Sequence, residues 1–152
     1  MKIKILIPVY NDWQSVFKLV DEINNLSIDP KFEISVIIVN DASNHDRSEE
    51  SKDLSNIHSY KIINMKKNQG HARCIAVGLK YIFEKEDFDY VIPMDGDGED
   101  RPIEIKDFID QINTSDGKPI VGLRVKRSES LLFQICYKIH KAITLAFTGK
   151  SI

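Results

Sequence analysis

The chain has 152 residues, a length that fits one globular domain. A composition of 42% hydrophobic and 29% charged residues excludes collagen-like, low-complexity and disordered classes. The net charge is −2, which argues against a general nucleic-acid-binding surface, so no nucleic-acid partner is expected.

Apolar periodicity predicts alternating strands and helices along the chain. Nearly continuous apolar runs are typical of parallel strands that are buried on both faces. The expected strands are 3–7, ended by Pro8, then 34–39, 60–63, 90–92, ended by Pro93, and 119–123. Helical spacing predicts helices at 13–23 with Asp12 as N-cap, 72–83, 105–112 with Pro102 at the first helical position, and 131–147. The predicted fold class is therefore α/β, with a mostly parallel sheet and helices on both faces.

Ligands of open α/β sheets bind at the carboxyl ends of the strands. This rule selects four polar segments that follow predicted strands: 8–12, 40–44, 68–73 and 95–101. The last segment holds four acidic residues within six positions, interleaved with glycines: Asp95, Gly96, Asp97, Gly98, Glu99 and Asp100. Their mutual repulsion would be unfavourable without a cation, and carboxylate oxygens suit Mg²⁺ or Mn²⁺. An exposed acidic turn is the alternative interpretation.

Two other interpretations fit the acidic segment less well. An EF-hand loop requires Gly at its sixth position and Glu at its twelfth, but Asp100 and Lys106 stand there when counting begins at Asp95, so that interpretation fails. The run Asp95-Gly96-Asp97-Gly98 resembles the motif of haloacid dehalogenase-class phosphatases, but that family has Thr or Val where Glu99 stands. That family also places the motif after its first strand, so the phosphatase remains a weak alternative.

The other strand-end segments contain further candidate site residues. Asp41 could accept hydrogen bonds from a nucleobase or ribose, or could bond to its own turn. Gly70 and Arg73 open a helix, which is a place suited to phosphate, although a lone Arg is more often a surface charge. His71 is more often a loop histidine than a base. Arg124, Lys126 and Arg127 form a basic cluster that could meet an anion or remain a solvated turn.

Four segments, in this order, resemble the motifs of family 2 glycosyltransferases: 3–12, 36–43, 68–73 and 94–102. The polyprenyl-phosphate branch, which includes dolichol-phosphate mannose synthase-like enzymes, is the most similar. The resemblance covers about residues 3–127 and implies a GT-A fold, which is Rossmann-like. Asn40 and Asp12 depart from the Asp and Glu that many members have at these positions.

The resemblance also implies roles for individual residues. Asp95 and Asp97 would be the catalytic metal-holding pair, with Glu99 as a third ligand of Mg²⁺ or Mn²⁺. The residues implied to bind the donor are Pro8, Tyr10, Asp12, Asp41, Gly70, Arg73, Asp95 and Gly96. The acceptor would meet Arg124 and Arg127. The activity implied is transfer of a sugar from a UDP-, GDP- or dTDP-sugar to a polyprenyl phosphate or a cell-envelope glycan precursor. A non-catalytic fragment that binds nucleotide sugar or metal is the alternative.

Residues 1–127 are expected to form the nucleotide-sugar-binding domain. Residues 128–152 would form an amphipathic helix, the start of an acceptor region that is cut short at the C-terminus. Residues 118–152 carry seven basic side chains and one acidic side chain. We therefore expect this segment to contact a membrane surface peripherally or to self-associate, with core packing as the alternative. Two unpaired cysteines, no signal peptide and no apolar membrane span predict a cytoplasmic protein at the inner face of the membrane.

Overall fold

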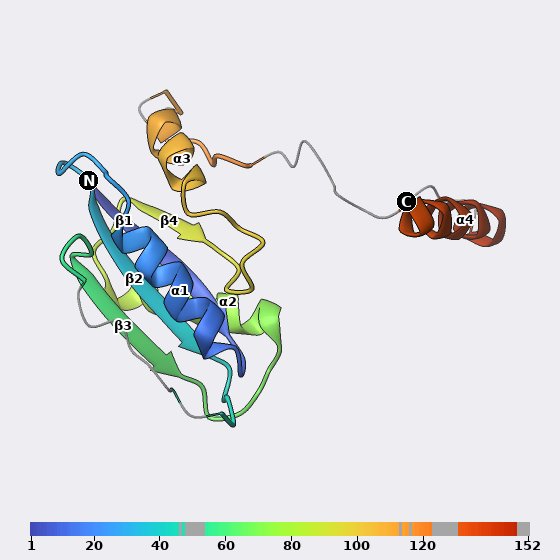
Figure 1. Cartoon of the computed structure of the whole chain (residues 1–152), viewed down its shortest axis with the longest axis horizontal. Helices are drawn as coiled ribbons and strands as arrows, with labels where there is room; N and C mark the ends of the chain where they lie inside the picture. The colour runs from blue at the N-terminus through green and yellow to red at the C-terminus, as the bar shows by residue number, and fades with distance from the viewer. Residues whose placement is uncertain (46, 48–53, 113, 116, 123–130, 149–152) are drawn as a thin grey trace. The chain divides into compact units, whose positions relative to one another are not determined.

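The computed structural model describes residues 1–45, 47, 54–112, 114–115, 117–122 and 131–148. The chain forms two compact units, Met1–Gly117 and Lys118–Ile152. The first unit is built on a four-stranded parallel sheet with the strand order β3-β2-β1-β4 (Figure 1). Its strands are β1 (Lys2–Val9), β2 (Glu33–Asn40), β3 (Ser59–Asn64) and β4 (Tyr90–Pro93).

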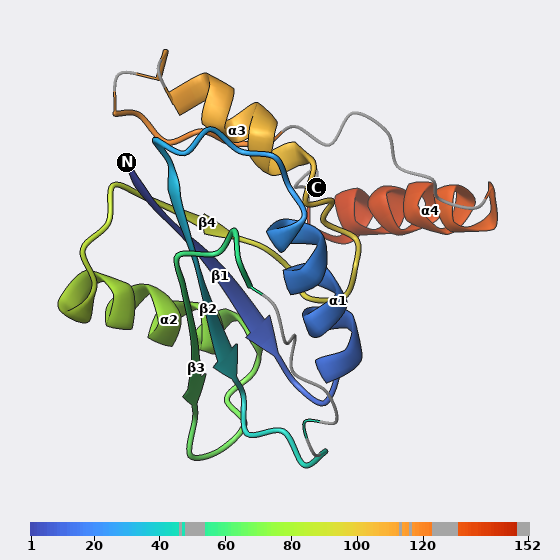
Figure 2. The same ribbon diagram turned by 60° about the vertical axis from the view of Figure 1, so that its left-hand side comes forward.

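Helices cover both faces of this sheet. The helix α1 (Trp13–Asn24) lies on one face and α2 (His71–Lys85) on the other, and the arrowheads of β1, β2 and β3 point the same way (Figure 2). A third helix, α3 (Glu104–Ile112), follows β4. The predicted α/β class with a parallel sheet and helices on both faces is confirmed.

The central strands have the burial that their apolar runs predicted. Residues Ile3 to Val9 of β1 and Ile34 to Val39 of β2 are buried, because helices cover both faces of the sheet. Asp12 caps α1, since its carboxylate accepts a hydrogen bond from the Ser15 N–H at 3.2 Å. The predicted N-cap is therefore confirmed.

Proline positions differ from the prediction in two places. β1 continues through Pro8 to Val9, although Pro8 was expected to end it. The carbonyl of Leu6 accepts the Met94 N–H at 2.9 Å, and β4 has already ended at Pro93. Pro8 is two residues after Leu6, so an N–H at this position would point toward the same neighbouring strand, β4. Because β4 has already ended, the missing N–H of Pro8 removes no hydrogen bond from the sheet.

Pro102 lies in a turn before α3 rather than in the first position of the helix, because the Glu104 and Ile105 N–H groups bond to carbonyls three residues back.

The strand predicted at 119–123 is not formed in the residues that the structure describes. Residues 119–122 have no strand geometry and Val121 is 84% exposed, while Leu123 lies outside the described residues. A strand requires a neighbour to pair its N–H and C=O groups, and the sheet ends at β4 in the described part of the chain. An apolar run in the sequence does not show whether a neighbouring strand is available for pairing.

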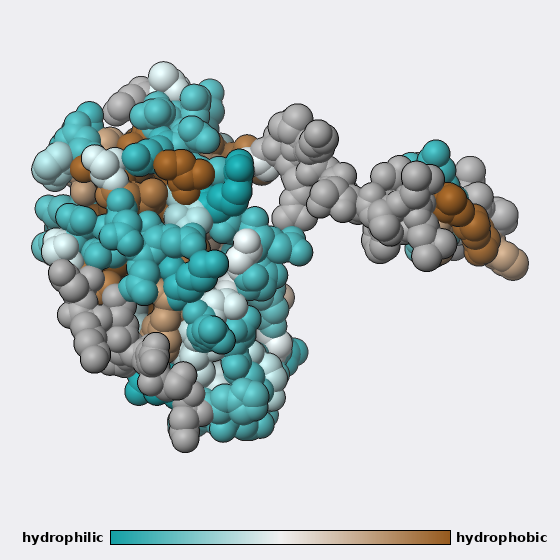
Figure 3. Space-filling view, in the orientation of Figure 1, coloured by the Kyte–Doolittle hydropathy of each residue, from teal (hydrophilic) through white to brown (hydrophobic). Residues whose placement is uncertain are grey.

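The second unit contains the helix α4 (Leu131–Thr148), which confirms the helix predicted over 131–147. Several of its large side chains with apolar surface are exposed: Ile135, Tyr137, Ile139, Ile143 and Phe147. Figure 3 shows brown, hydrophobic atoms on the described part of this helix. No helix in the described part of the chain combines the length and apolar character needed to cross a membrane.

Replacing Gly78 with alanine is expected to destabilise the first unit. A Cβ at this position of α2 would lie 2.4 Å from Leu6 Cδ1 and 2.9 Å from Val39 Cγ2, both in the buried core. Overpacking a core costs about 1–3 kcal/mol, whereas alanine in a helix returns about 1 kcal/mol over glycine. The difference is a net loss of up to about 2 kcal/mol, measured by denaturant unfolding. A raised stability, the usual result at an exposed helical glycine, would contradict this packing.

Candidate functional site

A pocket of about 310 Å³ opens where β1 and β4 end. It is lined by six residues that the sequence singled out: Pro8, Tyr10, Asp12, Asp95, Gly96 and Asp97. Val9, Val16 and His71 complete the lining. The pocket therefore combines three carboxylates with an aromatic ring, and Tyr10 is 47% exposed.

Close packing of the loop after β4 places Asp95 and Asp97 in this pocket. Gly96, which lies between them, is buried, and a Cβ here would lie 2.6 Å from Val16 Cγ2 and 3.2 Å from the carbonyl oxygen of Pro8. Only glycine allows the loop to press against the end of β1 and the first turns of α1. Gly96 therefore allows a close approach of the backbone, and the neighbours that it approaches belong to β1 and α1.

Hydrogen bonds within the loop give two of its acids a structural role. Asp100 accepts the Asp95 N–H at 2.8 Å, and Asp97 Oδ1 accepts the Glu99 N–H at 2.9 Å. Asp97 therefore keeps its second carboxylate oxygen for a ligand. The Glu99 side chain is exposed and is not part of the pocket lining.

His71 is a pocket residue that the sequence analysis did not select. It begins α2, and its Nε2 lies 3.4 Å from Asp95 Oδ1, with both side chains about half exposed. The available signal was its place in segment 68–73, directly after a predicted strand end. Its residue type alone could not distinguish a pocket residue from a loop histidine.

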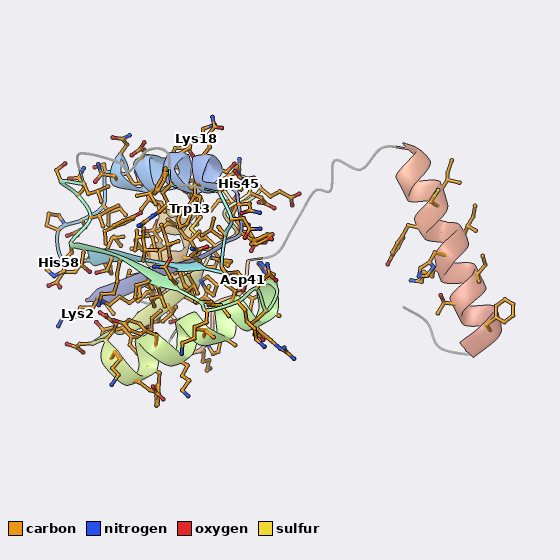
Figure 4. All side chains as sticks on the ribbon, turned by 90° about the horizontal axis from the view of Figure 1, so that it is seen from below. Lys2, Trp13, Lys18, Asp41, His45 and His58 are labelled. Atoms are coloured by element: carbon orange, nitrogen blue, oxygen red, sulfur yellow. The ribbon has the colours of Figure 1, made fainter. Side chains whose placement is uncertain are left out.

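Asp41 is buried, with 3% of its surface exposed, and is held by the loop that leads into α2 (Figure 4). Its Oδ1 accepts the Gln69 N–H and its Oδ2 accepts the Gly70 N–H, both at 2.8 Å. Asp41 thus fixes the start of α2.

Cys74, in the same helix, is a buried thiol that stays protonated at neutral pH. Burial, together with the nearby charge of Asp41, raises the pKa of this thiol to about 11. The thiol donates a hydrogen bond to the Val39 carbonyl at 3.1 Å.

Hydrogen bonds from Asn11 join the loop after β1 to the loop after β2. The Asn11 N–H donates to Ser43 Oγ at 2.8 Å, and Asn11 Oδ1 accepts the N–H groups of Asn44 at 2.7 Å and His45 at 3.2 Å. Asn11 and Ala42 have φ angles of +62° and +56°, which non-glycine residues rarely adopt. Such strain persists where surrounding contacts fix it, often at functional sites. The sequence pattern alone does not predict a role for Asn11 or Ser43.

Three predicted donor-binding residues lie away from the pocket lining: Asp41, Gly70 and Arg73. Gly70 caps α2 with a φ of +86°, and its N–H is engaged by Asp41. Arg73 Nη1 donates to Gln69 Oε1 at 3.0 Å, and Arg73 lines a different pocket. The predicted acceptor residues Arg124 and Arg127 lie outside the described residues.

The candidate metal ligands in this pocket are two carboxylates, Asp95 and Asp97, rather than a complete cage. Within the described ranges no group of three or more His, Cys, Asp and Glu side chains is placed to hold a metal ion. Mg²⁺ is commonly held by one or two carboxylates together with substrate phosphates and water. Asp95 and Asp97 fit that arrangement, and the exposed Glu99 does not complete a three-carboxylate set here.

Open α/β sheets bind their ligands, nucleotides among them, at the carboxyl ends of the strands, which is where this pocket lies. The chain belongs to glycosyl transferase family 2, whose family model matches residues 4–140. The family match favours a transferase over the phosphatase alternative.

Curated relatives are longer than this chain. An undecaprenyl-phosphate 4-deoxy-4-formamido-L-arabinose transferase of Proteus mirabilis is 27% identical over 99% of this chain and 45% of its own length. An uncharacterized protein of Methanocaldococcus jannaschii is 26% identical over 78% of this chain and 50% of its own length. The chain therefore spans about half the length of these relatives.

Solved structures show the same fold. Residues 1–349 of TarS from S. aureus, in complex with UDP, match with a TM-score of 0.60 and 19% identity over 84% of this chain and 40% of that chain. The complex with UDP-GlcNAc matches with a TM-score of 0.58 and 18% identity over 84% and 39%. The mannosyltransferase PcManGT from Pyrobaculum calidifontis, in complex with GDP-Man and Mn²⁺, matches with a TM-score of 0.50 and 16% identity over 62% and 27%. These likenesses show the GT-A glycosyltransferase fold.

Proposed function

We propose that this chain forms the donor-binding part of a glycosyltransferase that uses a nucleoside-diphosphate sugar and a divalent cation. The observation that carries the proposal is the pocket in which Asp95 and Asp97 meet Pro8, Tyr10 and Asp12. Family membership supports it, as do the UDP, UDP-GlcNAc and GDP-Man bound by proteins of the same fold.

Most of the pocket residues have a role in this proposal. Asp95 and Asp97 would hold Mg²⁺ or Mn²⁺. Such a cation would supply Lewis-acid chemistry, that is, positive charge to offset the charge on a nucleoside diphosphate leaving group. Pro8, Tyr10 and Asp12 bind the nucleoside, and Gly96 lets the acidic loop approach them. Asp41 acts indirectly: it fixes the backbone of Gln69 and Gly70, which precede the pocket residue His71.

For the acceptor we propose a polyprenyl phosphate, as in the name of the Proteus relative, or a cell-envelope glycan precursor. A phosphate monoester is already largely anionic near pH 7, so it needs no general base. Residues 1–127 then bind the donor, while residues 128–152 contribute to acceptor binding. Arg124 and Arg127 attract the acceptor phosphate, and the apolar side chains of α4 contact the inner face of the membrane or a second copy of the chain.

Thermal unfolding with UDP, GDP or dTDP tests the donor site. Ligand at about 100 times its dissociation constant adds about 2.7 kcal/mol of stability. For a domain near this size we expect a melting temperature raised by about 5–11 °C, and more with Mn²⁺ than without it. The Asp95→Asn/Asp97→Asn variant should lose the metal-dependent part of the shift. No shift with any of the three nucleotides in the presence of Mn²⁺ would contradict a working donor site.

A further inference from the structure

A shallow groove of about 760 Å³ lies between the end of β3 and one face of α2. It shares no lining residue with the acidic pocket. The groove has an apolar floor formed by Ile63, Met65, Ala76 and Val77. Four cationic side chains surround this floor: Lys66, Lys67, Arg73 and Lys80.

The local structure explains this combination of charge and apolar surface. Residues 73, 76, 77 and 80 of α2 follow the spacing i, i+3, i+4 and i+7, so they share one face of the helix. Ile63 and Met65 pack partly against the core beneath α2. The floor is therefore continuous with the core, yet Val77 remains 38% exposed. β3 is an edge strand in the described part of the sheet, so no further strand covers this side.

The groove is positive although the unit around it is acidic. Residues 1–117 carry 14 basic and 22 acidic side chains, but no carboxylate lines the groove. Among the described residues, Lys66 and Lys67 have no carboxylate partner, and Arg73 bonds to the neutral Gln69 side chain. Lys80 reaches Glu84 at 3.8 Å, where both side chains are exposed. The positive charge is thus concentrated at one place and is little neutralised by neighbours.

We propose that this groove binds an anionic phospholipid at a membrane surface. The lipid phosphate lies among the four cations, and the upper acyl chains lie on the apolar floor. A soluble phosphate would use the charges and leave the floor in water, whereas a phospholipid occupies both. An acidic peptide paired with β3 would run along Ser59–Asn64, but the cations lie beyond the end of that strand and on α2. The groove shares no lining residue with the acidic pocket, so a lipid bound there would hold the domain against the membrane without occupying that pocket.

Vesicle flotation of the full chain tests the charged part of the site, with phosphatidylcholine vesicles that contain or lack phosphatidylglycerol. Each lysine near an anionic surface contributes roughly fivefold to binding. Lys66→Gln/Lys67→Gln should therefore lower binding to the anionic vesicles by about 25-fold. Lys18→Gln/Lys31→Gln is the matched control, because it removes the same charge from α1 and from the loop before β2. Every variant keeps the basic C-terminal segment, so its contribution is the same throughout.

Val77→Ser tests the apolar part without changing the charge. It should weaken binding to anionic vesicles while titration with soluble glycerol phosphate stays as in the wild type. The UDP-induced thermal shift should be unchanged in both groove variants, which separates this site from the proposed transfer reaction. Equal losses in the two double variants, or equal binding to vesicles without phosphatidylglycerol, would overturn the proposal. Wild-type vesicle binding by Val77→Ser would reduce the groove to a simple anion site, and binding of an acidic peptide without vesicle binding would assign it to a protein partner.

Discussion

Asp97→Ala is expected to lower the affinity for Mn²⁺, measured with a nucleoside diphosphate present, by more than about 100-fold. Outer-shell partners of metal ligands contribute roughly 10–100-fold to affinity, so loss of a ligand should exceed that range. Asp97 lines the acidic pocket, and its partner Asp95 alone would leave the cation one protein carboxylate. Calorimetric titration or Mn²⁺ electron paramagnetic resonance measures the effect, and equal affinity in wild type and variant would remove Asp97 from the metal site.

Two further variants separate ligation from loop shape. Asp97→Asn keeps an oxygen that can accept the Glu99 N–H but loses the negative charge, so it should also lose most of the metal affinity. Glu99→Gln should weaken binding much less, because the Glu99 side chain is not part of the pocket lining. A larger loss in Glu99→Gln than in Asp97→Asn would reverse the assignment of these two carboxylates.

Local pattern predicted the interior of this fold better than its edges. Burial on both faces leaves a continuous apolar run, so β1 and β2 were recognisable from the sequence alone. The strand expected at 119–123 was not found in 119–122, since strand formation depends on a pairing partner that the segment itself does not specify. The prediction that β1 ends at Pro8 was wrong because a proline is tolerated where no neighbouring strand needs its N–H. That condition is met because β4 is shorter than β1, and the relative lengths of paired strands are a tertiary property.

The candidate site shows the same limit at the level of single residues. The strand-end rule brought together Asp95, Asp97 and Tyr10 from segments far apart in sequence. It could not decide which residue at the start of α2 faces the pocket. Residues two apart on a helix lie about 200° apart, so the face that directs His71 toward Asp95 directs Arg73 elsewhere. Nor does sequence show that both oxygens of Asp41 are engaged by backbone N–H groups.

A buried ion pair fastens the end of α2 to the sheet. Lys4 is 6% exposed within β1, and its Nζ lies 3.2 Å from Glu86 Oε2 and 3.4 Å from Ser35 Oγ. Glu86 is the C-cap residue of α2 and also bonds Lys61 of β3 through its other carboxylate oxygen. One carboxylate therefore serves two cations, on the central strand β1 and on the edge strand β3.

Glu86→Gln is expected to destabilise the domain by about 3 kcal/mol at neutral pH, the lower end of the range for removing one partner of a buried pair. Lys4 is left with a buried charge and no carboxylate, and for a domain near this size the melting temperature should fall by roughly 6–12 °C. Asp87→Asn is the control, because Asp87 and Lys2 pair at the surface with side chains that are 82% and 43% exposed. That variant should melt as the wild type does.

The pH dependence of the Glu86→Gln effect gives a second, independent check. Lys61 and Lys4 hydrogen-bond the Glu86 carboxylate and hold its pKa below the ordinary value, despite the opposing effect of burial. A lowered folded-state pKa stabilises the protein above the unfolded value of about 4.3, and this contribution is lost as the pH falls through the folded-state pKa. The difference in melting temperature between wild type and Glu86→Gln should therefore be full near neutral pH and shrink below about pH 4. A difference that stays constant across this range would mean that the variant acts through packing rather than through the charge of Glu86.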